Sequence, residues 1–176
     1  MMKNFDIVVA IDSQGGVGFQ GSIPWKVKGD MAFFKRLTTL SEEGKKNGVI
    51  MGRKTWDSLP ASYKPLPDRV NLVLTRSATL DLPEGVCSFS SLDDGVTFSE
   101  NHTIDRLFVI GGSEIYREAI QSQWCRCLYV TYIEGQYNCD TFFPEIPDRF
   151  HLMSESKKIC ESDITYSFRV YNSVID

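Results

Sequence analysis

Asp30 is the charged side chain whose surroundings most strongly suggest chemistry. In the stretch GSIPWKVKGDMAFFKRLT, Phe33, Phe34 and Leu37 recur at helical spacing after Asp30, so the carboxylate falls on the apolar edge of a helix. Trp25 precedes that helix and can close over its start. An acid walled by aromatic side chains suits a flat heterocycle whose N–C–NH2 edge matches the two carboxylate oxygens. An ordinary first-turn acid explains Asp30 about as well, so both interpretations stay open here.

Glycine-opened helices indicate a second kind of chemistry. Two apolar runs end in glycine at a helix start, and a third ends in polar residues: VIMGRKT holds Gly52, Arg53, Lys54 and Thr55, FVIGGSEIY holds Gly111, Gly112 and Ser113, and LVLTRS holds Thr75, Arg76 and Ser77. Helix N-termini favour anions, so together these segments predict a cradle for a ligand with several phosphates, such as a dinucleotide. The standard glycine-rich fingerprints are absent, and a tight turn that serves only the fold explains either glycine junction taken alone.

No side chain is an obvious nucleophile. There is no G-x-S-x-G motif, and His102 and His151 lie in no catalytic pattern, which would be explained if a cofactor performs the chemistry. Arg69 can bind a carboxylate through its guanidinium, although a solvated arginine is the simpler explanation of that residue alone. The five cysteines lack C-x-x-C spacing and predict reduced thiols in a cytoplasmic protein, with no metal site.

Composition narrows the class of protein. The chain has 176 residues, of which 42% are hydrophobic and 24% charged, as is typical of one globular domain. A net charge of −4 disfavours general nucleic-acid binding, and no apolar run is long enough to cross a membrane. Any anionic ligand must therefore be met by local positive charge.

The elements that must position these residues alternate between strand and helix. Apolar runs predict buried strands at 5–11, 48–51, 70–75 and 106–111. Helical patterns follow at 30–40, 53–59 and 113–124, with a weaker one at 91–100. The last segments, 127–133, 149–159 and 164–174, have little helix between them and predict an antiparallel hairpin at the sheet edge. The expected fold is a single α/β domain, with a mostly parallel sheet of about eight strands flanked by helices.

The order of these motifs resembles the dihydrofolate reductase family from about residue 5 to residue 172. The resemblance runs through VVAID, GSIPW, DMAFFKRLT, VIMGRKTWDSL, LPDRVNLVLTRS, VIGGSEIY, YVTYI and DTFFPEI. It implies NADPH-dependent reduction of 7,8-dihydrofolate to tetrahydrofolate, by hydride transfer to C6 and protonation at N5, in support of one-carbon metabolism and thymidylate synthesis. It also implies that antifolates would bind.

The resemblance implies a role for each matching residue on the substrate side. Asp30 would bind the 2-amino group and N3 of the pterin and promote protonation, with Thr131 hydrogen-bonded to it and Trp25 positioning water. Arg69 would bind the substrate's α-carboxylate. The remaining substrate contacts would be Val8, Val9, Met31, Phe34, Ser58, Leu59, Leu66 and Ile110.

Cofactor contacts follow from the same resemblance. Arg53 and Arg76 would read the 2′-phosphate, which favours NADPH over NADH. A cis peptide is expected between Gly111 and Gly112, and the loop 12–23 is expected to be a mobile flap over the nicotinamide. The other cofactor contacts would be Ala10, Ile11, Gly18, Gly52, Lys54, Thr55, Thr75, Ser77, Ile110, Ser113, Glu114, Ile115 and Tyr116.

Other interpretations share parts of this pattern. The related pyrimidine reductases of riboflavin synthesis also use NADPH, and a nucleotide-binding domain without activity would keep the phosphate cradle. We expect residues 1–176 to form one dihydrofolate reductase domain, either as a monomer or as part of a bifunctional chain with thymidylate synthase. Met31 and Ser22-Ile23 depart from common family forms, and they bear on inhibitor selectivity and flap kinetics.

Overall fold

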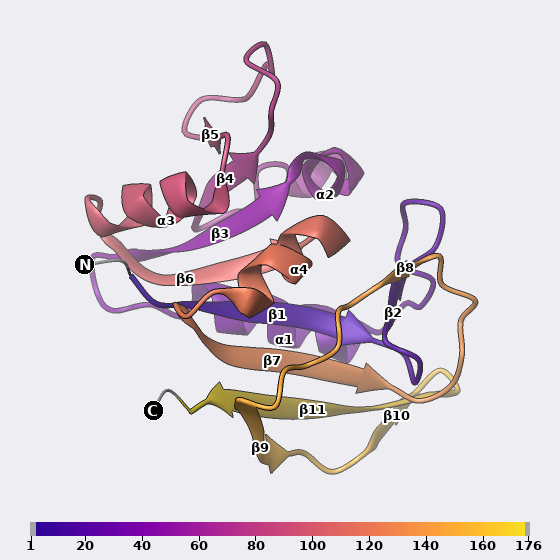
Figure 1. Ribbon diagram of the computed structural model, residues 1–176. Helices are drawn as coiled ribbons and strands as arrows, with labels where there is room; N and C mark the ends of the chain where they lie inside the picture. The colour runs from indigo at the N-terminus through magenta and orange to yellow at the C-terminus, as the bar shows by residue number, and fades with distance from the viewer. Residues whose placement is uncertain (1–2, 175–176) are drawn as a thin grey trace.

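A twisted sheet forms the centre of the computed structural model, which describes residues 3–174 (Figure 1). Its strands lie in the order β10-β11-β7-β1-β6-β3-β4-β5, and β9 pairs with β11. They are β1 (Phe5–Ile11), β3 (Lys46–Gly52), β4 (Arg69–Leu74), β5 (Cys87–Phe89), β6 (Ile104–Gly111), β7 (Cys125–Ile133), β9 (Phe150–Glu155), β10 (Ile159–Glu161) and β11 (Ile164–Ser173). The expected single-domain α/β architecture is confirmed.

The parallel part of the sheet brings the ends of distant segments together. β1 runs parallel to both β6 and β7, and β3 runs parallel to β6 and β4. These strands therefore end at one edge of the sheet, where parallel sheets characteristically bind ligands.

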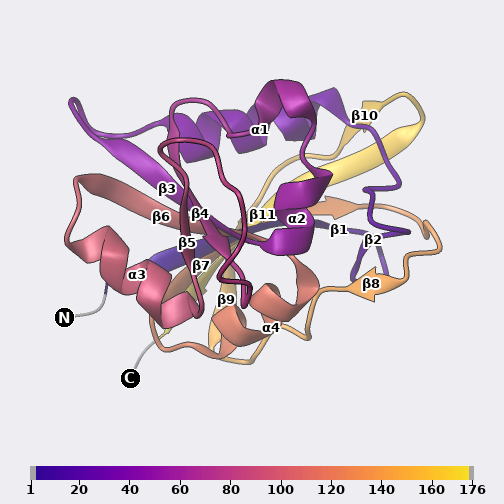
Figure 2. The ribbon, with the colours of Figure 1, turned by 90° about the horizontal axis from the view of Figure 1, so that it is seen from above.

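Helices cover both faces of the sheet (Figure 2). α1 (Lys28–Thr39) and α2 (Arg53–Ser58) lie on one face, followed by a 3₁₀ turn at Ala61–Tyr63. α3 (Leu92–Glu100) and α4 (Ser113–Gln121) lie on the other. Side chains of β1 alternate between the two cores, with Val8 packing under α1 and α2 and Val9 packing under α3 and α4.

The C-terminal antiparallel hairpin is confirmed, with one break. β11 pairs antiparallel with β7 on one side and with β9 and β10 on the other. The single strand predicted over 149–159 is divided, because Ser156 turns its hydroxyl oxygen toward the N–H of Phe168 and interrupts the ladder.

Several boundaries differ from the sequence expectations. α1 begins at Lys28 rather than residue 30, and α4 ends at Gln121 rather than residue 124. The strands β2 (Gly16–Gly18) and β8 (Thr141–Phe142), which form a second two-stranded sheet, were missed, as was β5. Each of these strands has three residues or fewer, too short for an alternating pattern to be recognised.

Candidate active site

Asp30 contacts the strand that lies beneath the start of α1. Thr131 of β7 is 2% exposed and donates a hydrogen bond from Oγ1 to Asp30 Oδ1 at 2.6 Å. Burial raises the pKa of Asp30, and the Thr131 hydrogen bond opposes that rise. The carboxyl group therefore holds its proton to a higher pH than a solvated aspartate does.

Trp25, which precedes α1, lies in a small apolar cluster. It is 5% exposed and packs with Val27, Ile133 and Tyr166. Its ring meets that of Tyr137 edge-on, with the centroids 5.3 Å apart. Trp25 is therefore largely withdrawn from solvent just before the start of α1.

Tyr116 of α4, on the face of the sheet opposite α1, is hydrogen-bonded to β1. Its hydroxyl donates to the backbone oxygen of Val8 at 2.8 Å. Burial and then the charge of Asp30 raise the pKa of the phenol, so it stays protonated. Ala10 and Ile11, which end β1, are partly exposed beyond this bond.

Most of the predicted apolar substrate contacts share one cluster under α1 and α2. Its members from the predicted set are Val8, Phe34, Leu59, Leu66 and Ile110. Three other predicted residues lie differently. The Val9 side chain is in the opposite core, Met31 is 66% exposed, and the hydroxyl of Ser58 donates to the backbone oxygen of Thr55 at 2.7 Å.

Arg69 is held beneath α1 although it begins a strand. It is 8% exposed, and its Nη1 donates to Thr38 Oγ1 at 3.0 Å while Nε donates to the Pro67 oxygen at 2.8 Å. Burial lowers the pKa of the guanidinium, and Asp68 raises it, without removing its charge. These bonds use two of the five N–H donors of the guanidinium and fix its plane. The group lies close to the Phe34 ring.

The glycine junctions of β3 and β6 converge as the sequence predicted. The peptide between Gly111 and Gly112 is cis, as expected. A Cβ added at either of these glycines would lie 3.1 or 3.3 Å from Thr55 Oγ1, and one added at Gly52 would lie 3.2 Å from Ile115. The backbone at these junctions is thus closely approached by Thr55 and Ile115, so a side chain at any of the three positions would be crowded.

A hollow of about 210 Å³ lies at the end of β4. Thr75, Arg76 and Ser77 line it together with the end of β5 and Ser90. Arg76 is exposed, Lys54 is exposed on α2, and Arg53 contacts Asp57 at 3.5 Å. Exposed cations beside glycine-opened helices fit an anionic group such as a sugar phosphate.

Asp12 organises the segment expected to be a flap, and sequence reasoning missed it. Its buried carboxylate accepts hydrogen bonds from the backbone N–H groups of Gln14, Gly16 and Tyr137, at 2.9, 2.8 and 3.1 Å respectively. Gly18 also pairs with Thr141. The predicted contact residue Gly18 is therefore held by the 137–143 loop.

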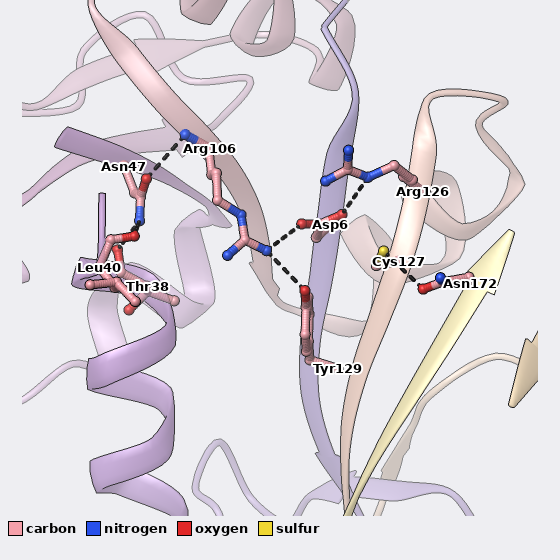
Figure 3. A network of polar contacts seen from close by, with 9 residues as sticks. All are labelled: Asp6, Thr38, Leu40, Asn47, Arg106, Arg126, Cys127, Tyr129 and Asn172. Atoms are coloured by element: carbon pink, nitrogen blue, oxygen red, sulfur yellow. Dashed lines mark hydrogen bonds and ion pairs between the residues drawn. The ribbon is translucent and has the colours of Figure 1, made fainter. Parts of the chain in front are cut away.

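A separate polar network lies near the start of the same strands (Figure 3). Asp6 is 2% exposed and pairs with Arg106 at 2.9 Å, and Arg106 also donates to the Tyr129 hydroxyl. A hollow of about 290 Å³ opens there, lined by Asp6, Arg106 and Arg126 among others. Apart from Arg69, the predicted contacts on the strands lie away from these starts, and none of them lines this hollow, so it is not part of the candidate active site.

Comparisons with known proteins agree with this geometry. A family model described as dihydrofolate reductase matches residues 4–173. Dihydrofolate reductase of Heliothis virescens is 42% identical, over 96% of this chain and 97% of the relative. The structure of Schistosoma mansoni dihydrofolate reductase superimposes with a TM-score of 0.87 at 34% identity, covering 99% of this chain and 100% of that one.

Plant relatives place a similar sequence within a longer polypeptide. The bifunctional dihydrofolate reductase-thymidylate synthase of Glycine max is 38% identical over 97% of this chain, which spans 34% of the plant protein. No helix within residues 3–174 has both the length and the apolar character needed to cross a membrane. On the family model and the full-length relatives, the chain belongs to the dihydrofolate reductase family, whose members are NADPH-dependent oxidoreductases.

Proposed function

We propose that this chain reduces 7,8-dihydrofolate to tetrahydrofolate with Asp30 as the acid that holds and protonates the pterin. The observation that carries the proposal is the short hydrogen bond from Thr131 to a half-buried carboxyl group at the start of α1. A carboxylate anchored through Oδ1 has a defined plane, so its two oxygens face a planar N–C–NH2 edge in a fixed direction.

The same carboxyl group suits proton delivery. Because burial raises the pKa of Asp30, a fraction of the molecules carries a proton at a pH where a solvated aspartate carries almost none. In this proposal, Trp25, which is buried just before α1, positions the water that passes the proton to N5. The partly buried setting also strengthens the interaction of the carboxylate with the pterin.

The rest of the substrate would lie along the apolar cluster under α1 and α2. Phe34, Leu59, Leu66 and Ile110 would contact the pterin and benzoyl rings, and Arg69 would bind the α-carboxylate. The hydrogen bond that Arg69 donates to Thr38 supports this role, because a pre-oriented guanidinium loses less entropy when it binds a carboxylate.

The chain's residues also fit NADPH. The bare backbone at Gly52, Gly111 and Gly112 would hold the pyrophosphate, and the hollow at Arg76 and Ser77 would accept the phosphorylated ribose. Bound NADPH supplies the hydride that reduces the pterin. Arg53, Lys54, Thr55, Thr75, Ser113, Glu114 and Ile115 complete the proposed phosphate contacts, with Ala10, Ile11, Gly18 and Tyr116 around the nicotinamide.

A decrease in NADPH absorbance with 7,8-dihydrofolate tests the activity, with Asp30→Asn beside the wild type. We expect rapid oxidation by the wild type and a large loss in the variant, most severe at high pH. Asp93→Asn is the matched control, because Asp93 is an exposed first-turn acid of α3. If both variants behave alike, Asp30 is only a first-turn acid.

The alternative functions separate in the same assay. A pyrimidine reductase would oxidise NADPH with a ribitylamino-pyrimidine and not with dihydrofolate. A binding domain without activity would bind NADPH and transfer no isotope-labelled hydride to either substrate. The contact between Asp30 and Thr131 favours the folate substrate over both.

We further propose that residues 1–176 act as one dihydrofolate reductase domain in the cytoplasm. Five free cysteines support a reducing compartment. Size-exclusion chromatography with light scattering would distinguish a monomer from an assembly, and the plant relatives make a domain of a bifunctional chain the alternative.

A further inference from the structure

The first turn of α1 is capped from the far end of the sequence. Val27, at the N-cap position, makes no side-chain hydrogen bond to the helix. Instead, Glu161 of β10 accepts the N–H of Lys28 at Oε1, at 2.7 Å, and the N–H of Gly29 at Oε2, at 3.0 Å. One carboxylate thereby satisfies two of the backbone donors that a helix leaves unpaired at its start.

The hydroxyl of Tyr166 in β11 lies between Glu161 and the start of α1. It donates to Glu161 Oε2 at 3.5 Å and occupies the space beside Gly29, where an added Cβ would lie only 2.1 Å from the hydroxyl oxygen. Tyr166 is 2% exposed, so it cannot move aside without disturbing its apolar neighbours. The close approach of α1 to the hairpin therefore requires glycine at position 29.

The same hairpin also supports Thr131, the hydrogen-bond donor to Asp30. Phe168 of β11 pairs with Thr131 across the ladder, and its ring packs on that of Phe33 with the centroids 4.3 Å apart. Both the helix turn that carries Asp30 and the strand that donates to it thus rest on β10 and β11.

Glu161 keeps its charge at neutral pH. The N–H groups of Gly29 and Lys28 hold the pKa of this carboxyl below its usual range. A negative charge at a helix N-terminus also interacts favourably with the helix dipole.

We propose that Glu161 is a positioning residue for Asp30. By holding the first turn of α1, it sets the direction of the Asp30 carboxylate and thereby the affinity for the pterin edge of the substrate. This inference rests on the proposed role of Asp30. It predicts an effect confined to dihydrofolate, because the hydrogen bonds of Glu161 within residues 3–174 go to the start of α1 and to Tyr166, away from the glycine junctions proposed to hold NADPH.

Steady-state kinetics of Glu161→Ala and Glu161→Gln would test the proposal. Losing a helix cap should raise the KM for dihydrofolate about 3- to 30-fold in the alanine variant, with the KM for NADPH unchanged. Glutamine keeps one acceptor oxygen and should recover part of the effect. In parallel, amide hydrogen exchange at Lys28 and Gly29 should accelerate in both variants.

Glu155→Gln is the matched control. Glu155 is a carboxylate of the same hairpin, bonded to Ser167 and Arg169, that does not cap α1. Its substitution should leave both KM values unchanged.

Several outcomes would overturn the proposal. An unchanged KM for dihydrofolate in folded Glu161→Ala would do so, as would equal increases in the KM for both substrates, which indicate general loosening. If the alanine variant does not fold, the folded glutamine variant decides, because it too must show the dihydrofolate-specific increase. Asp30→Asn measured alongside separates the two proposals: wild-type kinetics in that variant refute the role of Asp30 itself, whatever Glu161 does.

Discussion

Replacing Thr131 by valine removes one hydrogen bond from Asp30 and little else. Valine has nearly the shape of threonine, so at this almost fully buried position the substitution exchanges a hydroxyl for a methyl group. What is lost is the 2.6 Å donor to Asp30 Oδ1.

The magnitude follows from the charge of the acceptor. A hydrogen bond to a charged group contributes about 1.5–3 kcal/mol, and here it stabilises the ionised form of Asp30. The protonated carboxyl can still accept a weaker hydrogen bond of about 0.5–1.5 kcal/mol, so Thr131→Val removes about 1–1.5 kcal/mol of preference for the ionised form. The pKa of Asp30, already raised by burial and held down by Thr131, therefore rises further.

The assay is single-turnover hydride transfer followed by stopped flow across a range of pH. If Asp30 provides the proton, the pH at which the rate begins to fall should move upward in Thr131→Val. Thr131→Ser keeps the hydroxyl and should leave the profile near that of the wild type. An unmoved profile in a folded valine variant would refute the reasoning, as would an equal displacement in the serine variant.

Three further perturbations test other parts of the structure. Gly29→Ala should destabilise the protein by about 1–3 kcal/mol, since its Cβ would meet the Tyr166 hydroxyl, and adding Tyr166→Phe should restore part of the loss in urea unfolding. Because burial raises the folded-state pKa of Asp30, its contribution to the free energy of unfolding is most favourable below the ordinary carboxyl pKa of about 3.9 and declines as pH rises through the raised value. Asp30→Asn should flatten that decline in urea unfolding at several pH values; a slope equal to that of the wild type would contradict it. Neutralising Arg53 and Arg76 together should raise the KM for NADPH far more than that for NADH, and equal increases would argue against phosphate recognition.

The sequence predicted those features that depend on the pattern of residues within a single segment. The apolar runs predicted the parallel strands, and glycines at the ends of two of them predicted junctions that the structure brings together at Gly52 and Gly111. The position of Asp30 on an apolar helix edge predicted its unusual environment, although not its partner.

What could not be predicted depends on contacts between distant segments. Asp12 looks like an ordinary loop acid until residues 134–143 fold over it, and Glu161 looks like a hairpin acid until it meets Lys28 and Gly29. The early start of α1 has the same origin, because its cap comes from β10 rather than from the preceding residues. No local pattern encodes a hydrogen bond between residues more than a hundred positions apart.

The place of β1 in the sheet has a consequence for synthesis on the ribosome. β1 is translated first, yet its two neighbours are β6 and β7, which begin at Ile104 and Cys125. At roughly 5–20 residues per second, the apolar segment FDIVVAI stays without either partner for roughly 5 to 20 s, until β6 has been made. During that interval the nascent chain exposes an unpaired apolar segment, the kind of surface that aggregates unless a chaperone covers it.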